Sequence, residues 1–378
     1  MSIAVQLSKE CGVTRVSDIA GLDRLHIPCY QSVRATALAE QGNISVYSGA
    51  SFNAPTAKMK SLMEAIERYW AENSLVRTYV SSISDLKRQK SPFIDPVSIP
   101  LPVNVTIDEK DVLEWVEAFD FQGNSFFLTA HDAFCPYVPS EKGTHNPRIW
   151  RSAGIATGAD YLEAAFYATL EVIERDAVAL SKISTQVVTS VDLAEIDIEN
   201  IRLLLDWISN HDIKCSIKKL SALGHVEVFV AILEDRRNPD PLLFVGGYGA
   251  DLDPVVAIEQ SIMEALQSRA VVISGAREDL DVHSRISLDE QALIKRSEWV
   301  NYQSVASYQL PEMDSKPINT NLKDVFAALI STLASQGYFA YFVELTPKGY
   351  PLSVVRAVIP GASHITETQI RLGSRVVI

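Results

Sequence analysis

The chain has 378 residues and a formal net charge of −13, with 47% hydrophobic and 21% charged residues. This composition is typical of a globular protein, and the length is enough for two ordinary domains or one large one. The acidic charge argues against non-specific binding to nucleic acid or to an anionic membrane, because either would need a basic surface. We therefore expect no nucleic-acid partner and no membrane partner, although a local basic pocket for a phosphate ligand stays open.

Neither a transmembrane helix nor a secretory signal is predicted. The sequence contains no run of about 18 apolar residues, and the N-terminus MSIAVQLSKE lacks the hydrophobic segment of a signal peptide. The four cysteines are scattered, without a CxxC pair or a Cys/His cluster: Cys11, Cys29, Cys135 and Cys215. We therefore expect neither a disulfide framework nor a metal–thiolate site, and predict a cytoplasmic location.

Helical and strand patterns alternate along the chain. In chain order, the periodicity predicts a helix at 55–74, a strand at 125–130, helices at 160–183 and 198–210, strands at 226–233 and 241–249, helices at 254–273 and 321–336, and strands at 338–345 and 352–359. Loops are expected at 91–105 and 134–148. The alternation predicts an α/β or α+β fold. No linker-like segment divides the chain, so we expect one large unit, with an N-terminal subdomain as the alternative.

One helical pattern occurs three times, as LMEAIERYW (62–70), LEVIERDAV (170–178) and IMEALQSRAV (262–271). Each copy follows a glycine-containing segment: YSGASFNA (47–54), RSAGIATGAD (151–160) and GGYGADLDP (246–254). The copies are too far apart and too unevenly spaced for a solenoid repeat. The pattern therefore predicts a site assembled from three distant segments.

Taken singly, the first and third helices have a simpler interpretation. In the first, Glu64, Glu67 and Arg68 lie opposite an apolar stripe, which is typical of a solvated amphipathic helix with a Glu64–Arg68 pair. In the third, Glu264 and Gln267 share a polar arc, which fits a surface helix equally well. Only the matching spacing of the three copies favours a common site.

The second helix is apolar nearly all round, as a buried helix is. Glu174 falls between Leu170 and Val178 on the helical wheel. A buried carboxylate needs a base or a cation, because desolvating it alone costs several kcal/mol. An Arg175–Glu171 pair satisfies one carboxylate and leaves the other needing a metal ion or another base. Oxygen ligands alone favour Mg²⁺, which commonly bridges carboxylates to phosphates, so nucleotide chemistry is predicted.

The usual nucleotide-binding and hydrolase motifs are missing. The sequence contains no GxxxxGK[ST] loop, no GxGxxG followed by a helix within a βαβ unit, no HRD or DFG motif, and no GxSxG turn. An ATP-dependent enzyme with this sequence would therefore belong to an unusual fold.

Three segments closely resemble the signature regions of the YcaO-domain family: SLMEAIERYWAE (61–72), SAGIATGADYLEAAFYATLEVIERDAVAL (152–180) and GYGADLDPVVAIEQSIMEALQSRAVVISGAREDL (247–280). RVSDIAGLDRLHIPCYQSVR (15–34) and VVRAVIPG (354–361) are also similar to that family. The resemblance implies a single domain over 1–378, with a lead-in at 1–45 and a signature core at about 46–361. It also implies an enzyme that uses ATP and Mg²⁺ to phosphorylate the oxygen of a peptide backbone amide, leading to an azoline, a thioamide or an amidine in a ribosomally made peptide or protein.

The resemblance also implies the site residues. Those expected to bind ATP are Arg34, Glu67, Glu171, Gln267 and Arg277. Those expected to bind Mg²⁺ are Glu64, Glu67, Glu171, Glu174 and Glu264. No dedicated protein nucleophile is expected, since positioning and the chemistry of Mg²⁺ and ATP supply the catalysis.

Two departures from the family pattern bear on function. The turn SGASFN (48–53) lacks the lysine of many members, for which Lys58 or Lys60 is a possible substitute, and the end ETQIRLGSRVVI lacks the proline-rich tail of many azoline-forming members. We expect a peptide or protein substrate, a leader-binding E1-like or TfuA-like partner, and a homodimer. The alternative is a degenerate member that acts as a scaffold or accessory subunit; the preserved glutamates argue against it.

Overall fold

The computed structural model describes residues 2–37, 44–102, 105–139, 144–145, 151–183, 188–238, 240–276, 307–310, 321–365, 370–371 and 373–376. Within these ranges, no helix is both long enough and apolar enough to cross a membrane.

The N-terminal part forms an antiparallel sheet of three strands in the order β1-β2-β3. Its elements are α1 (Ser2–Glu10), β1 (Val13–Asp18), the 3₁₀ turn η1 (Ala20–Leu22), β2 (Cys29–Arg34) and β3 (Val46–Ala50). Helix α2 (Ala54–Asn73) follows and packs on β2 and β3. It begins where Asn53 accepts a hydrogen bond from the Thr56 N–H, with a proline in its first turn.

A second sheet has the strand order β4-β5-β13-β14-β7, with β6 paired to the side of β5. Its strands are β4 (Thr78–Ser82), β5 (Val112–Phe119), β6 (Ser125–Thr129), β7 (Ile155–Gly158), β13 (Tyr341–Glu344) and β14 (Ser353–Val358). The short helices α3 (Ile83–Gln89) and α4 (Ala130–Ala133) and the turn η3 (Pro96–Ser98) accompany it. Helix α5 (Tyr161–Ile183) packs on β7 and β14.

A third sheet has the order β11-β10-β9-β8-β12. Its strands are β8 (Val188–Val191), β9 (Ile213–Leu220), β10 (Glu227–Asp235), β11 (Val245–Asp251) and β12 (Ser307–Tyr308). Helices α6 (Glu199–Asn210) and α7 (Pro254–Ser274) share one apolar core with this sheet, and α5 and α10 (Leu322–Ser335) share another with β10. The remaining elements are the turns η5 (Leu193–Glu195) and η6 (Pro241–Leu243) and the pair β15 (His364–Ile365) and β16 (Ile370–Arg371).

The mixed α/β fold agrees with the prediction, and so do the five predicted helices, whose ends lie within two residues of those observed. Two strand predictions were wrong at their starts. The strand predicted at 338–345 begins only at Tyr341. In the strand predicted at 241–249, residues 241–243 form a 3₁₀ turn and the strand begins only at Val245. Pro241 explains the difference, because it fixes its own φ and has no N–H for a strand ladder.

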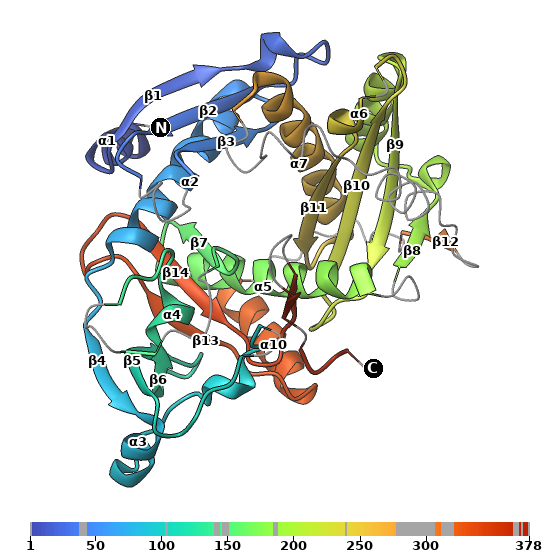
Figure 1. The fold of residues 1–378 in the computed structure, drawn as a ribbon. Coiled ribbons are helices and arrows are strands. Elements are labelled where there is room, and N and C mark those ends of the chain that lie inside the picture. Colours follow the sequence, from blue (N-terminus) through green and yellow to red (C-terminus); the bar gives the residue numbers. More distant parts are fainter. Residues whose placement is uncertain are drawn as a thin grey trace.

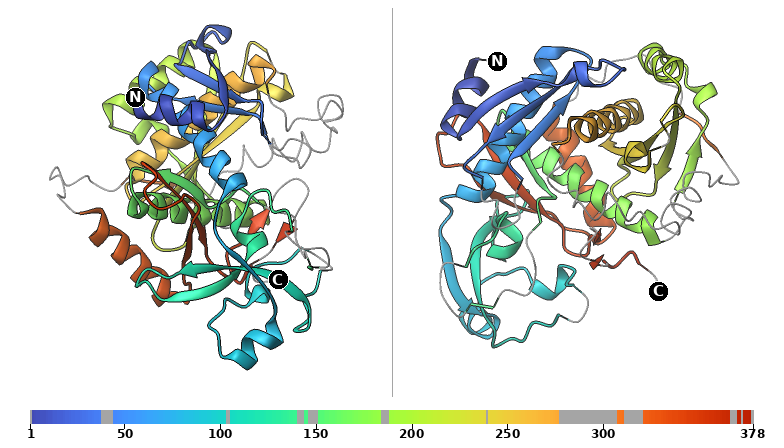
Figure 2. Two further views of the ribbon diagram at one scale, coloured as in Figure 1. Left: turned by 90° about the vertical axis from the view of Figure 1, so that its left-hand side faces the viewer. Right: turned by 45° about the horizontal axis from the view of Figure 1, so that its top comes forward.

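The three long helices connect the three sheets into a ring. Each helix packs on the strand that precedes it and also reaches a strand of the next sheet: α2 reaches β7, α5 reaches β11, and α7 reaches β3. Figure 1 shows the three sheets at the periphery with α2, α5 and α7 on their inner sides. In the left view of Figure 2, α2 descends from the N-terminal sheet toward the second sheet. The inner edges of β3, β7 and β11 and the three repeated helices are thereby directed toward one region.

Candidate functional site

Two glycines let β3 and β11 lie directly against the helices that follow them. A Cβ on Gly49 would be 2.4 Å from both the Ala57 carbonyl oxygen and the Ser61 nitrogen. A Cβ on Gly249 would be 2.1 Å from the Ala257 oxygen and 2.7 Å from the Ser261 nitrogen. Real Cβ contacts do not come this close, so both positions require glycine. The contacted residues stand at the same separations from each glycine, so the first and third units are built alike.

A backbone hydrogen bond fixes the first glutamate of each repeated pattern, Glu64, Glu171 and Glu264. In all three units a backbone N–H before the helix donates to that carboxylate: Ser48 to Glu64 at 3.1 Å, Gly154 to Glu171 at 3.0 Å, and Tyr248 to Glu264 at 2.6 Å. Each carboxylate is thus oriented by its own unit. A carboxylate that accepts a backbone N–H is held in one direction and its charge is partly stabilised.

The second acidic or amide position links neighbouring units. Glu67 forms a hydrogen bond with the Thr157 backbone of β7, and Gln267 accepts one from the Ala50 N–H of β3 at 2.9 Å. Glu174 stands at the same position in α5. Among the described residues, no backbone N–H donates to it. Glu174 is buried, with 8% of its surface exposed. In the described part of the chain, its ionised form is therefore stabilised by a charged neighbour, Arg175, and not by the backbone.

The carboxylates are close enough to change one another's ionisation. Burial raises the pKa of Glu64 and of Glu264, and the charge of Glu171 raises both further. Glu67 has a pKa well above its usual value, mainly through burial and then through Glu171 and Glu64. Burial, followed by the charges of Glu264 and Glu171, raises the pKa of Glu174 to about 8 against the opposing effect of Arg175. The structure therefore brings the five predicted glutamates into one electrostatic cluster.

Two arginines lie within this cluster. Arg175 Nε is 3.8 Å from Glu171 Oε1, and Arg175 Nη2 is 3.5 Å from Glu174 Oε1. Arg68 lowers the pKa values of Glu64 and Glu67, although its Nε is buried without a hydrogen-bond partner. The two positions are equivalent, since each arginine directly follows the second glutamate of its E-x-x-E pair. Sequence reasoning treated these residues only as ion-pair partners; the repeated E-x-x-E-R pattern was the signal that would have marked them as part of the site.

A buried histidine shows that further arginines adjoin the cluster. Burial, and then the charges of Arg151, Arg371, Arg175 and Arg356, lower the pKa of His364 to about 3. His364 is in β15, which packs against α5. Positive charge is thus concentrated beside the carboxylates.

The cluster does not itself form a metal-ligand set. Across the part of the chain that the structure describes, no three His, Cys, Asp or Glu side chains stand close enough to hold a metal ion. The binding of Mg²⁺ by these five carboxylates therefore stays a prediction. In the structure three of them accept backbone N–H bonds, and Arg175 lies beside Glu171 and Glu174.

The donor set nevertheless fits Mg²⁺ bound with phosphates. Five buried or half-buried carboxylates lie around Arg68 and Arg175, and Lys60 has charge interactions with Glu259 and Glu264. Burial first, and then the charges of neighbouring glutamates, raise the pKa values of Glu64, Glu67, Glu174 and Glu264 and so disfavour their ionised forms. A divalent cation with oxygen ligands would stabilise those ionised forms. Lys60 of α2, proposed above as a substitute for the missing lysine, therefore lies near the carboxylate cluster.

Arg34 lies elsewhere. It is buried in β2, where Nη1 and Nη2 donate to the two carboxylate oxygens of Glu72 on α2, and Nη2 also donates to the Tyr47 hydroxyl at 2.9 Å. These bonds occupy the guanidinium and tie the N-terminal sheet to α2. The geometry therefore gives Arg34 a structural contact in place of the phosphate contact that we expected. Arg277, the other expected phosphate ligand, lies outside the described residues.

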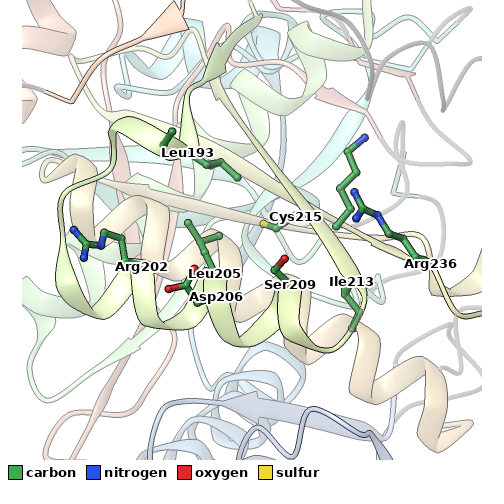
Figure 3. A pocket seen from close by; sticks show the side chains of 10 residues that line it. Leu193, Arg202, Leu205, Asp206, Ser209, Ile213, Cys215 and Arg236 are labelled. Carbon is green, nitrogen blue, oxygen red and sulfur yellow. The ribbon is translucent and has the colours of Figure 1, made fainter.

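A cavity of about 350 Å³ between α6 and β9 is a different feature. Figure 3 shows Arg202 and Asp206 toward one end of it and Arg236 toward the other. None of the glutamates above lines it. Two of its basic residues are already paired, Arg202 with Asp197 at 2.7 Å and Lys214 with Glu234 at 3.8 Å. We therefore do not assign the reaction to this cavity.

The buried carboxylates predict a pH effect on stability. We expect the metal-free protein to lose stability relative to a Glu174→Gln variant as the pH rises from about 5 to about 8. In this window Glu174 keeps its proton in the folded state, with a pKa of about 8, whereas an unfolded glutamate ionises near pH ~4.3. The folded state then binds more protons than the unfolded state, so stability falls with rising pH.

Urea denaturation in EDTA at several pH values checks this difference. The comparison with the variant matters because His364, with its lowered pKa, acts in the opposite direction below about pH 6.5 in both proteins. Parallel pH profiles for the two proteins would contradict the prediction.

Comparisons with known proteins add to this geometry. A family model described as YcaO cyclodehydratase, ATP- and Mg²⁺-binding, matches residues 48–363. The chain is 30% identical over 370 residues to a protein of Methanothermobacter thermautotrophicus, covering 97% of this chain and 93% of the relative. It is 24% identical to a protein of Rhizobium leguminosarum bv. trifolii described as lying in the tfuA 3′ region, covering 98% of this chain and 88% of that protein.

Two solved structures share the fold. YcaO from Methanopyrus kandleri bound with AMPPCP and Mg²⁺ matches with a TM-score of 0.74 at 20% identity, covering 98% of this chain and 92% of that one. A heterocyclase in complex with substrate and cofactor matches with a TM-score of 0.78 at 18% identity. The match covers 96% of this chain but only 52% of the heterocyclase.

Proposed function

Because the chain belongs to the YcaO family of ATP- and Mg²⁺-binding proteins, we propose that it uses ATP to activate backbone amides of a peptide or protein. The observation that carries this proposal is Glu174, a buried carboxylate that receives no backbone hydrogen bond among the described residues and lies beside Glu171 and Glu264. A buried carboxylate of this kind lowers the stability of the fold, so a structural role alone does not explain it. A role in binding Mg²⁺ does explain it.

The cluster divides into two kinds of residue. Glu64, Glu67, Glu171, Glu174 and Glu264 would hold Mg²⁺, because carboxylate oxygens are its preferred protein ligands. Arg68 and Arg175 would contact the phosphates, since a guanidinium matches phosphate geometry and keeps its charge when buried. Glu67 and Glu64 raise the pKa of Arg68, and Glu174 and Glu171 that of Arg175, against the effect of burial. Both arginines are thus charged before any ligand arrives.

Amide activation fits a site of this kind. An amide is a poor electrophile because of resonance along its C–N bond, and ATP supplies a phosphoryl group that turns the amide oxygen into a leaving group. The protein's own contribution is to hold the reacting groups in position and to stabilise the charge on the transferred phosphoryl group. Positioning and electrostatic stabilisation are the general means by which enzymes accelerate phosphoryl transfer. No side-chain nucleophile of the protein is required.

The product depends on what attacks the activated carbon. A neighbouring Cys, Ser or Thr of the substrate gives an azoline with net loss of water, external sulfide gives a thioamide in which sulfur replaces oxygen, and an amine gives an amidine. The location described for the rhizobial relative supports a TfuA-type partner for this chain and, with it, the thioamide. We propose that one domain carries this activity, as a homodimer; an E1-like leader-binding protein is the other candidate partner.

The test of ATP use is calorimetric titration of the purified protein with ATP and Mg²⁺. We expect saturable heat that disappears in EDTA, because the phosphates alone add negative charge to an acidic cluster. The alternative function, a non-catalytic scaffold or accessory subunit, predicts no heat with millimolar ATP. Intact-protein mass measurement of a modified substrate then separates the products, since an azoline is lighter than the starting peptide and a thioamide is heavier.

A further inference from the structure

Each of the three long helices meets a strand of the next sheet at one junction, and the contacts at the three junctions differ. At two of them a side chain at the second acidic or amide position bonds to the next strand, Glu67 to the Thr157 backbone and Gln267 to the Ala50 N–H. The junction between α5 and β11 has no bond of this kind among the described residues, because Glu174 receives no backbone hydrogen bond. There, Arg175 Cζ lies 5.7 Å from the centroid of the Tyr248 ring.

Tyr248 thereby contacts both sides of the site. Its backbone N–H donates to Glu264 Oε2 of α7 at 2.6 Å. Its ring faces Arg175 of α5, which lies 3.8 Å from Glu171 and 3.5 Å from Glu174. The backbone bond belongs to any residue at this position. The ring contact is specific to an aromatic side chain.

The contacts between Arg175 and the carboxylates are too long to fix its guanidinium. Hydrogen bonds of this type are about 2.7–2.9 Å long, and both observed separations exceed that. An arginine side chain has many rotamers, and holding one of them costs conformational entropy. The face of an aromatic ring attracts a guanidinium and limits where it can lie. Such a contact therefore selects one position of Arg175 before any ligand binds.

We propose that Tyr248 is a positioning residue whose ring holds Arg175 between Glu171 and Glu174, where it is ready to contact the phosphates of ATP. This inference rests on the proposed function. Arg68, the equivalent arginine of α2, has no aromatic ring under its guanidinium among the described residues, and Glu67 is instead tied to the β7 backbone. At the third junction the Tyr248 ring thus fixes the position of a charged side chain, as a side chain–backbone hydrogen bond does at the other two.

Two substitutions separate the ring from the rest of the residue. Tyr248→Phe keeps the aromatic face, and Tyr248→Leu keeps apolar packing but removes it; both keep the N–H that orients Glu264. The probe is the non-hydrolysable analogue AMPPCP with Mg²⁺, titrated calorimetrically into each folded protein. We expect Tyr248→Leu to weaken binding about three- to tenfold, as for the loss of a partly exposed cation–π contact. Binding by Tyr248→Phe is expected to stay within about twofold of wild type.

A double-mutant cycle with Arg175→Met isolates the pair. In that background Tyr248→Leu is expected to cause no further loss of binding, because the cation that the ring positions is gone. Equal losses in Tyr248→Phe and Tyr248→Leu, unchanged binding in Tyr248→Leu, or additive losses in the cycle would each overturn the inference. A wild-type protein that does not bind the analogue would instead overturn the proposed function and the inference with it. Melting temperatures without nucleotide show whether each variant is folded.

Discussion

Replacing Glu174 by Gln is expected to lower ATP turnover by about 10²–10³-fold, the range for the loss of one preorganised electrostatic contact. Glutamine keeps the shape of the side chain and removes the charge that Mg²⁺ needs. Glu174 accepts no backbone N–H among the described residues, so the substitution breaks no hydrogen bond to the main chain. Its pKa of about 8 means that ionising it in the folded protein is already unfavourable. The apo protein is therefore expected to keep or gain stability.

The measurement is ATP turnover and melting temperature on the same purified variant. Glu163→Gln is the matched control, since Glu163 is in the first turn of the same helix. Among the described residues its side chain accepts one hydrogen bond, from the Ala159 N–H, and glutamine also makes this bond. That variant should retain wild-type turnover. If Glu174 serves only to pair with Arg175 at 3.5 Å, the reverse outcome is expected, with a lowered melting temperature and unchanged turnover.

Gly249→Ala is expected to cause a large loss of stability, about 3 kcal/mol or more, at the upper end of the range for overpacked sites. Its Cβ would be 2.1 Å from the Ala257 carbonyl oxygen and 2.7 Å from the Ser261 nitrogen. Both are backbone atoms of α7, so no side chain can rotate away to make room. Strand β11 would have to move off α7, and the Tyr248–Glu264 bond would be lost with it. Nucleotide binding should therefore fall together with stability.

Gly246→Ala provides the control in the same strand. A Cβ there has the Ala231 oxygen at 3.6 Å as its nearest neighbour, which is an ordinary contact. We expect this variant to remain within about 1 kcal/mol of wild type, since it also reduces the entropy of the unfolded chain. Urea denaturation of the two variants checks the comparison. Equal stability of the two would show that β11 and α7 separate easily and that the close approach has no energetic importance.

The sequence by itself determined the helices and the residue types of the site. The spacing of apolar residues predicted α2, α5 and α7, and local capping explains their ends: Asn53 and Asp253 accept N–H bonds at the starts of α2 and α7, and Gly275 takes a positive φ of 72° at the end of α7. These signals are local, because each depends on residues within about one turn of the helix. The burial of Glu174 followed from its apolar neighbours in the same helix.

Only the tertiary structure decided which way the polar faces point. From sequence, Glu64, Glu67 and Arg68 fitted a solvated face equally well; in the fold α2 reaches β7 and turns that face inward. Strand β7 has only four residues, IATG, too few for a reliable periodicity, yet its backbone binds Glu67. Its place depends on pairing with β14, roughly two hundred residues away in sequence.

The same limit explains the contacts that sequence reasoning did not predict. Arg34 ends a segment that resembles the family lead-in, but its partner is chosen by the packing of β2 on α2, which places Glu72 against its guanidinium. The contact of Tyr248 with Arg175 joins β11 to α5 and has no sequence signature. Periodicity and capping are set by neighbours along the chain, whereas ion pairs and ring contacts between elements are set by how the sheets close around the three helices, and that closure is a property of the whole fold.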